Sequence, residues 1–263
     1  MMNIRQIEQL IKNNTAVNEY EITEITQTSK QAYYVFDKLE TLRSNDTTSL
    51  SCNLYVNIDD KKGTSSFNVI AADTEQTIHD KLESTLSKAK LALNPQYPLT
   101  PYQKPLDSVT LLPVSDDEIL KNVAEAVFRA KTEENESLNA TEIFVDTKTT
   151  HFINSNGVDA RYNNYSYFIE TIPTYKGKEE VELYYSTRRS DLCYEQITKD
   201  IEEALHYVKY RANAKKLADT DIPSDTPVYI KGDMFAMFMN AFAEELNYRS
   251  TFYHSNHYSV NDI

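Results

Sequence analysis

Glycine is scarce in this chain, which has only four glycines among 263 residues: Gly63, Gly157, Gly177 and Gly232. Their spacing leaves no GxGxxG loop, no phosphate-binding loop that ends in Gly-Lys-Ser/Thr, and no GxSxG elbow. Such motifs need glycine because the backbone must turn sharply or approach a ligand closely. The sequence therefore excludes the common nucleotide-binding and serine-hydrolase classes that depend on them.

Cysteine, long apolar runs and basic blocks are also sparse. The two cysteines, Cys52 and Cys193, cannot form a disulfide framework. The sequence has no run of about 18 apolar residues, and its N-terminus lacks the apolar core of a signal peptide. The formal net charge is −13, and no long Lys/Arg block is present, which disfavours nucleic-acid binding. We therefore expect a soluble cytoplasmic protein that binds neither membranes nor nucleic acid.

A strand pattern followed by a helix pattern occurs twice. Between Leu50 and Ile58 every second residue is apolar, which predicts a strand with one buried face. Apolar stripes of identical helical spacing follow, shifted by 119 residues: Ile78, Leu82, Thr85, Leu86, Ala89 and Leu93, then Ile197, Ile201, Ala204, Leu205, Val208 and Ala212. The recurrence indicates a degenerate repeat of a unit in which strands precede a helix.

Proline separates the two copies. Five of the eight prolines lie between residues 94 and 113, which predicts an extended connector, and Ser115-Asp-Asp-Glu118 is a capping box that opens a helix. The expected fold class is α+β, with two similar antiparallel-sheet-plus-helix units joined by a proline-rich connector and a helix. The expected domains are 1–94 for the first unit, 95–138 for the connector and helix, 139–220 for the second unit, and 221–263 for a short strand and an apolar helix leading toward a missing C-terminal domain.

Two segments, in this order, resemble motifs of the TldD/PmbA family. Phe152-Ile-Asn-Ser-Asn-Gly-Val-Asp159 is similar to the family's Asn-Ser-x-Gly turn, and Val228–Ser250 is similar to its zinc-protease helix with the Tyr-Arg-Ser that follows. The resemblance implies a paired assembly. The TldD type is a zinc metallopeptidase that acts on peptides or unfolded chains, and the PmbA type, also called TldE, is its companion without a metal site. The older label, modulator of DNA gyrase, names no DNA-binding mechanism.

The zinc-binding residues of that helix are absent from this sequence. In TldD-type members the helix reads His-Glu-x-x-x-His, and the resemblance places these three residues at Asn240, Ala241 and Glu245. An amide is a poor zinc ligand and alanine cannot act as a general base. The resemblance thus implies the non-catalytic PmbA branch, without a cofactor. The family takes a further ligand from a C-terminal domain, so we expect either an N-terminal fragment or a naturally short relative.

Tyrosines and histidines provide weaker candidates. Tyr162, Tyr165 and Tyr167 are possible peptide-facing residues of a long aromatic strand, and the alternative is that they are ordinary strand residues. His254 and His257 have a spacing that suits metal ligands. Without a third ligand, we expect them to be solvated or to face a partner.

The apolar helix near the C-terminus also bears on function. Its Met and Phe side chains surround the helix, so we expect a partner subunit or a further domain to cover it. The leading hypothesis is a non-catalytic PmbA/TldE-like subunit or fragment, which pairs with a family partner chain or a second copy and helps enclose peptide or unfolded-protein substrates. The alternatives are a zinc metallopeptidase whose active site needs residues outside this chain, and a stand-alone binding or scaffold module.

Overall fold

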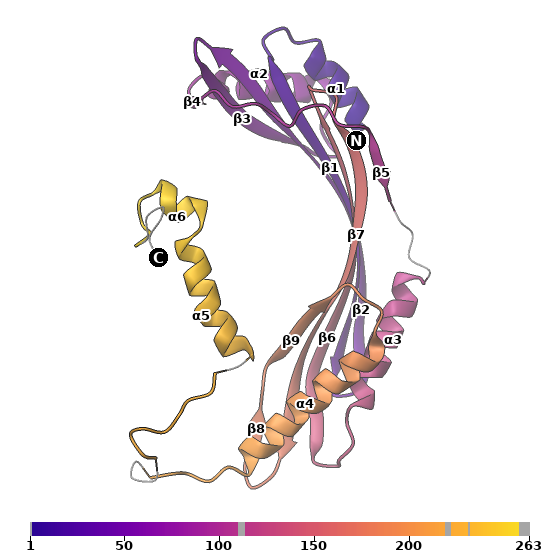
Figure 1. The fold of residues 1–263 in the computed structure, drawn as a ribbon. Helices are drawn as coiled ribbons and strands as arrows, with labels where there is room; N and C mark the ends of the chain where they lie inside the picture. Colours follow the sequence, from indigo (N-terminus) through magenta and orange to yellow (C-terminus); the bar gives the residue numbers. More distant parts are fainter. Residues whose placement is uncertain (1, 110–113, 219–221, 231, 258–263) are drawn as a thin grey trace. The chain divides into compact units, whose positions relative to one another are not determined.

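The computed structural model describes residues 2–109, 114–218, 222–230 and 232–257 (Figure 1). The chain divides into two compact units, Met1–Ala214 and Lys215–Ile263, and each is described by itself. No helix among the described residues is long and apolar enough to cross a membrane.

The first unit combines helices with a large sheet. Its helices are α1 (Ile4–Lys12), α2 (Glu75–Ala89), α3 (Asp116–Arg129) and α4 (Tyr194–Ala212). Its strands are β1 (Glu19–Val35), β2 (Lys38–Ile58), β3 (Lys61–Val69), β4 (Leu93–Pro95), β5 (Leu106–Ser108), β6 (Glu136–Asn154), β7 (Asp159–Lys176), β8 (Glu180–Glu182) and β9 (Tyr185–Arg189).

All nine strands belong to one sheet. The strand order is β4-β3-β2-β1-β6-β7-β5, with β8 and β9 also paired to β7. Neighbouring strands are antiparallel except β5, which is parallel to β7. The α+β class is confirmed. The strands of the two expected units join in a single sheet, because β1 pairs with β6 from Glu21–Asn154 to Val35–Ala140 and so leaves neither strand with a free edge there.

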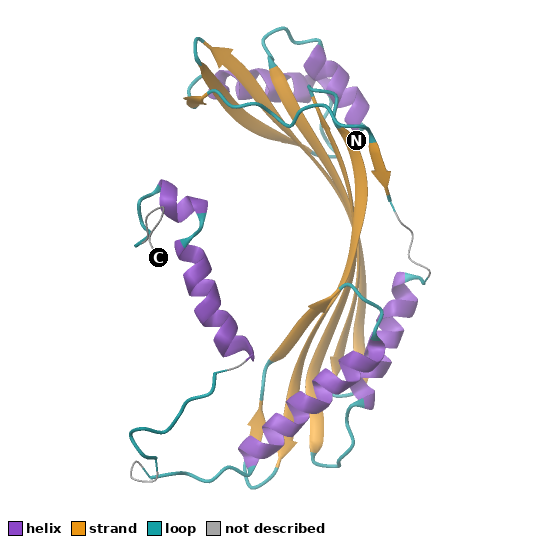
Figure 2. Ribbon diagram, in the orientation of Figure 1, coloured by secondary structure: helices purple, strands orange, loops and turns teal. Residues whose placement is uncertain are grey.

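Two hydrophobic cores lie on the same face of this sheet. In β1, Ile22 belongs to one core and Ala32 to the other. An even separation along a regular strand directs both side chains to one face. Helices α1 and α2 cover the first core, and α3 and α4 cover the second (Figure 2). The residues of β1 between Ile22 and Ala32 therefore lie between two helix-covered cores.

The predicted helix stripes are largely confirmed, and so is the predicted cap at Ser115. All six stripe residues of α4 are buried, and so are five of the six predicted for α2. The sixth, Leu93, lies beyond the end of α2 in β4 and is 39% exposed. Ser115 caps α3 by accepting a hydrogen bond from the backbone N–H of Glu118, and Thr74 caps α2 in the same way. Each cap satisfies a backbone donor that the helix itself cannot pair.

The second unit contains α5 (Gly232–Glu245) and α6 (Tyr248–Phe252). The apolar helix is confirmed, but the short strand expected to begin at Val228 is not formed. Val228 and Tyr229 are 82% and 87% exposed and lie in no strand. An extended segment needs a neighbouring strand to satisfy its backbone groups, and within the described part of this unit none is present.

Candidate functional site

A row of charged and titratable residues crosses three neighbouring strands of the sheet. Glu24 in β1 is directly opposite His151 in β6, and His151 is directly opposite Arg161 in β7. Directly paired residues share one face of a sheet. Since Glu24 lies two residues after the buried Ile22, the row is on the face that carries both cores and interrupts the apolar surface between them.

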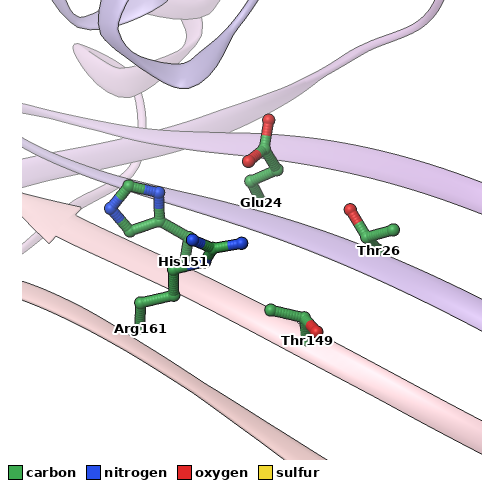
Figure 3. Close-up of a pocket in the computed structure, with 5 residues that line it drawn as sticks. All are labelled: Glu24, Thr26, Thr149, His151 and Arg161. Carbon is green, nitrogen blue, oxygen red and sulfur yellow. The ribbon is translucent and has the colours of Figure 1, made fainter. Parts of the chain in front are cut away.

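This row lines a cavity of about 330 Å³ (Figure 3). The next residues along β1 and β6 on the same face, Thr26 and Thr149, complete its lining. Figure 3 shows the side chains of Glu24, His151 and Arg161 rising from their strands around one space. The cavity is therefore polar, with two hydroxyl groups beside an acid, an imidazole and a guanidinium.

The imidazole is oriented by a carboxylate. Nε2 of His151 lies 2.8 Å from Oδ1 of Asp159, and the His151 side chain is 19% exposed. An ionised carboxylate can only accept hydrogen bonds, so Nε2 is the donor in this contact. In a neutral imidazole the other nitrogen, Nδ1, then keeps its lone pair. Asp159 is also ion-paired with Arg5 of α1. The ring is thus held from the strand end, with Nδ1 available as an acceptor.

Helix α1 is joined to the same end of the sheet through Glu8. Burial by itself would raise the pKa of Glu8, but hydrogen bonds from Lys12, Arg5 and Tyr20 outweigh it and lower the pKa. The Tyr20 hydroxyl donates to Glu8 at 2.8 Å. Arg5 therefore links two carboxylates: that of Glu8 on its own helix and that of Asp159, which orients His151.

The outer members of the row are unpaired. The side chains of Glu24 and Arg161 have no hydrogen bond or ion pair with any residue that the structure describes. Strand β6 separates them by two strand spacings of about 4.8 Å each. A second hollow of about 320 Å³ is bordered by His151 and Arg161 themselves and by Asp107 and Asp159. The site thus offers a half-buried carboxylate and an exposed guanidinium on either side of an oriented imidazole.

Sequence reasoning missed this site. The sequence pattern indicated no functional role for Glu24, His151 or Arg161. One signal was present: polar residues at Glu24 and Thr26 interrupt the apolar positions of β1. Which residues of β6 and β7 lie beside them depends on strand register, and the sequence does not show register across such distances.

The Asn-Ser-Asn-Gly turn of the family resemblance has a structural role at the neighbouring strand end. Asn154 is buried, and its Oδ1 accepts two backbone hydrogen bonds within the turn, each 3.0 Å long. Its Nδ2 donates to the carbonyl of Thr100 at 2.8 Å. Gly157 has a φ of +85°, and a Cβ there would lie 3.2 Å from the Tyr102 ring. The turn therefore ties the proline-rich segment to the sheet.

The three tyrosines of β7 do not share one face. Tyr167 is fully buried in the second core, and Tyr165 packs against that core. Burial raises the pKa of both hydroxyls, that of Tyr167 to about 12. Tyr162 points to the opposite face by strand alternation and is 37% exposed. Tyr162 is the most exposed of the three.

The positions that the resemblance assigns to the family's zinc helix lie on α5. Asn240 and Ala241 are exposed, and Glu245 contacts His257. The Glu245 carboxylate accepts a hydrogen bond from the backbone N–H of His257 at 2.8 Å, and Nδ1 of that ring lies 3.1 Å from it. The backbone hydrogen bond, supported by the ring, lowers the pKa of Glu245. His254 follows the end of α6 in a left-handed conformation with φ of +53°.

These residues supply few metal donors. Glu245 and His257 provide one oxygen and one nitrogen, whereas catalytic zinc takes about three protein ligands. Within residues 2–109, 114–218, 222–230 and 232–257, no group of three or more His, Cys, Asp or Glu side chains is placed to hold a metal ion.

Solved structures match this fold, although no family model and no curated protein matches the sequence. TldE from Thermococcus kodakarensis matches with a TM-score of 0.53 and 15% identity, over 76% of this chain and 47% of the other. The chain shares the fold of the part of TldE that it matches.

Two further structures agree. A proposed modulator of DNA gyrase from Thermotoga maritima matches with a TM-score of 0.58 and 13% identity, over 81% of this chain and 49% of its own. Another proposed modulator of DNA gyrase, from Bacteroides thetaiotaomicron, matches with a TM-score of 0.57 and 15% identity. The match covers 82% of this chain and 52% of the other. This chain thus spans about half the length of the structures it matches. The resemblance to the TldD/PmbA family is confirmed at the level of the fold.

Proposed function

We propose that this chain is a non-catalytic, TldE-like component of a TldD/PmbA-type assembly in the cytoplasm. The fold shared with TldE carries the proposal. The residues of α5 support its non-catalytic part, because Asn240 and Ala241 offer neither an imidazole ligand nor a general base.

In this role the chain supplies architecture and binding surface around peptide or unfolded-protein substrates. A TldD-like partner chain supplies the zinc chemistry, or a second copy completes the assembly. The surface of α5 supports pairing: Met234, Phe235 and Phe238 are 58%, 55% and 60% exposed. Clustered apolar side chains of this kind are typical of protein interfaces.

Co-purification with a TldD-like chain from the same genome tests the proposal. We expect a stable heteromeric complex by size exclusion with light scattering, with zinc bound only when the partner is present. Peptidase activity of the complex should be unchanged by Glu245→Gln in this chain and lost when the partner's own zinc-helix glutamate is replaced.

Each alternative has its own outcome in the same experiment. Near-stoichiometric zinc in this chain alone, with activity lost in Glu245→Gln, contradicts the non-catalytic role and favours a metallopeptidase. A monomer that ignores the partner favours a stand-alone binding module. The polar cavity on the sheet is the observation that favours this second candidate.

A further inference from the structure

We propose that the cavity between the two cores binds a small zwitterion, a molecule that carries a primary ammonium group and a carboxylate. The site consists of Glu24, His151 and Arg161 with the hydroxyls of Thr26 and Thr149. It stands on the geometry of the sheet alone and does not depend on the assembly proposed above.

The charges at the two ends of the row select this ligand class. Glu24 and Arg161 have no partner among the described residues, and β6 keeps them apart. An ammonium group at Glu24 forms a charge-assisted hydrogen bond, and a carboxylate at Arg161 can be held by two parallel N–H donors. A ligand with both groups neutralises both ends at once.

Ions of a single sign fit less well. An anion at Arg161 is opposed by Glu24 on one side and, on the other, by Asp107, the residue opposite Arg161 in β5. A cation at Glu24 is opposed by Arg161. Like charges at close range disfavour each other, so the combined field of the site favours a ligand with separated opposite charges.

The middle of the site offers hydrogen bonds for the body of the ligand. Asp159 occupies Nε2 of His151, so Nδ1 is the ring nitrogen left to accept a hydrogen bond when the ring is neutral. The Thr26 and Thr149 hydroxyls can donate or accept. A volume of about 330 Å³ suits a free amino acid or a peptide of two or three residues. These two sources share the same charged ends, and ligand length distinguishes them.

Calorimetric titration of the full chain tests the ligand class. The probes are L-alanine, dialanine and trialanine, together with N-acetylated and C-amidated dialanine and with acetate. We expect saturable binding of at least one of the three zwitterions, and at least a tenfold loss of affinity when either charged end is blocked. The zwitterion bound most tightly identifies a free amino acid or a peptide as the source.

Charge-removing variants test the site. Glu24→Gln should weaken the best zwitterion about tenfold or more and abolish the preference over the acetylated form. Arg161→Gln should abolish the preference over the amidated form. Glu142→Gln and Lys148→Gln remove the same charges from the opposite face of β6 and should leave binding unchanged. Circular dichroism confirms that each variant is folded.

Three results would overturn the proposal. One is that none of the zwitterions binds. Another is that acetate binds as tightly as the zwitterions and responds only to Arg161→Gln, which identifies a plain anion site. The third is that the amide resonances whose chemical shifts change on ligand addition all lie outside β1, β6 and β7. None of these outcomes bears on whether the chain pairs with a TldD-like partner.

Discussion

Two tyrosine hydroxyls show how the surroundings of a buried polar atom decide whether it stabilises the fold. The hydroxyl of Tyr20 donates to Glu8, and burial together with that bond raises its pKa. The hydroxyl of Tyr165 is buried and has no hydrogen-bond partner among the described residues. Removing water from a hydroxyl costs free energy unless a protein partner replaces it.

We therefore expect opposite effects from the same substitution. Tyr165→Phe should leave the free energy of unfolding unchanged or raise it by up to about 1 kcal/mol, because an unpaired polar atom is removed. Tyr20→Phe should lower it by about 1–2 kcal/mol, because the buried Glu8 carboxylate loses a donor. Urea unfolding at pH 7 measures both. A loss of more than about 1 kcal/mol in Tyr165→Phe would indicate that its hydroxyl is hydrogen-bonded in solution.

Lys62 shows how a buried charge is accommodated. Its ammonium group is ion-paired with Glu19 and donates a hydrogen bond to the backbone carbonyl of Tyr97 at 2.5 Å. The same group lies 4.8 Å from the centroid of the Tyr97 ring. A desolvated cation needs both a counter-charge and hydrogen-bond acceptors. This single side chain therefore joins β3 to the proline-rich segment.

Helices approach the sheet closely at two glycines. A Cβ on Gly63 in β3 would lie 2.1 Å from the backbone oxygen of Ala89, at the end of α2. A Cβ on Gly177, after β7, would lie 3.3 Å from the Cβ of Ala212 in α4. Neither glycine has a positive φ. The two positions therefore differ in how closely the helix end approaches.

The expected outcome is a large difference between two chemically identical substitutions. Gly63→Ala should lower the free energy of unfolding by about 2–3 kcal/mol, because backbone must move to relieve the overlap. Gly177→Ala should cost less than about 1 kcal/mol, since a small shift of side chains relieves the contact. Thermal and urea unfolding measure the difference. A loss below about 1 kcal/mol in Gly63→Ala would show that α2 moves away from β3 at little cost.

At the scale of the whole molecule, the buried hydrophobic cores found in the described residues all belong to the first unit. In the second unit, large apolar side chains such as Met237 and Phe238 are 64% and 60% exposed. Burial of apolar surface is the main favourable term in folding. The first unit therefore contains the packing that a stable fold requires.

We expect a polypeptide of residues 1–214 to fold by itself. Its free energy of unfolding should lie within about 1 kcal/mol of that of the full chain, because the removed segment adds no buried core. Cooperative urea unfolding and dispersed amide resonances are the measurements. A 1–214 polypeptide that binds a hydrophobic dye and unfolds without cooperativity would show that the second unit stabilises the first.

Local patterns allowed much of the fold to be predicted. The apolar stripes of α2 and α4 and the cap of α3 depend on residues within a few turns of each other, so the sequence shows them directly. The Asn-Ser-Asn-Gly turn and the Val228–Ser250 segment carried a family resemblance, and the fold agrees with that resemblance. The division at residues 94, 138 and 220 stays a prediction.

The sequence by itself thus determined the α+β class and the positions of the main helices. That Asn240, Ala241 and Glu245 replace zinc-helix residues stays a prediction from the family resemblance. The tertiary structure alone decided that the strands form one sheet and that Glu24, His151 and Arg161 meet on it. The physical reason is the range of the interactions. Helix stripes and caps join residues close in sequence, whereas strand pairing joins residues more than 100 positions apart, such as Glu24 and His151, through backbone groups common to every residue type.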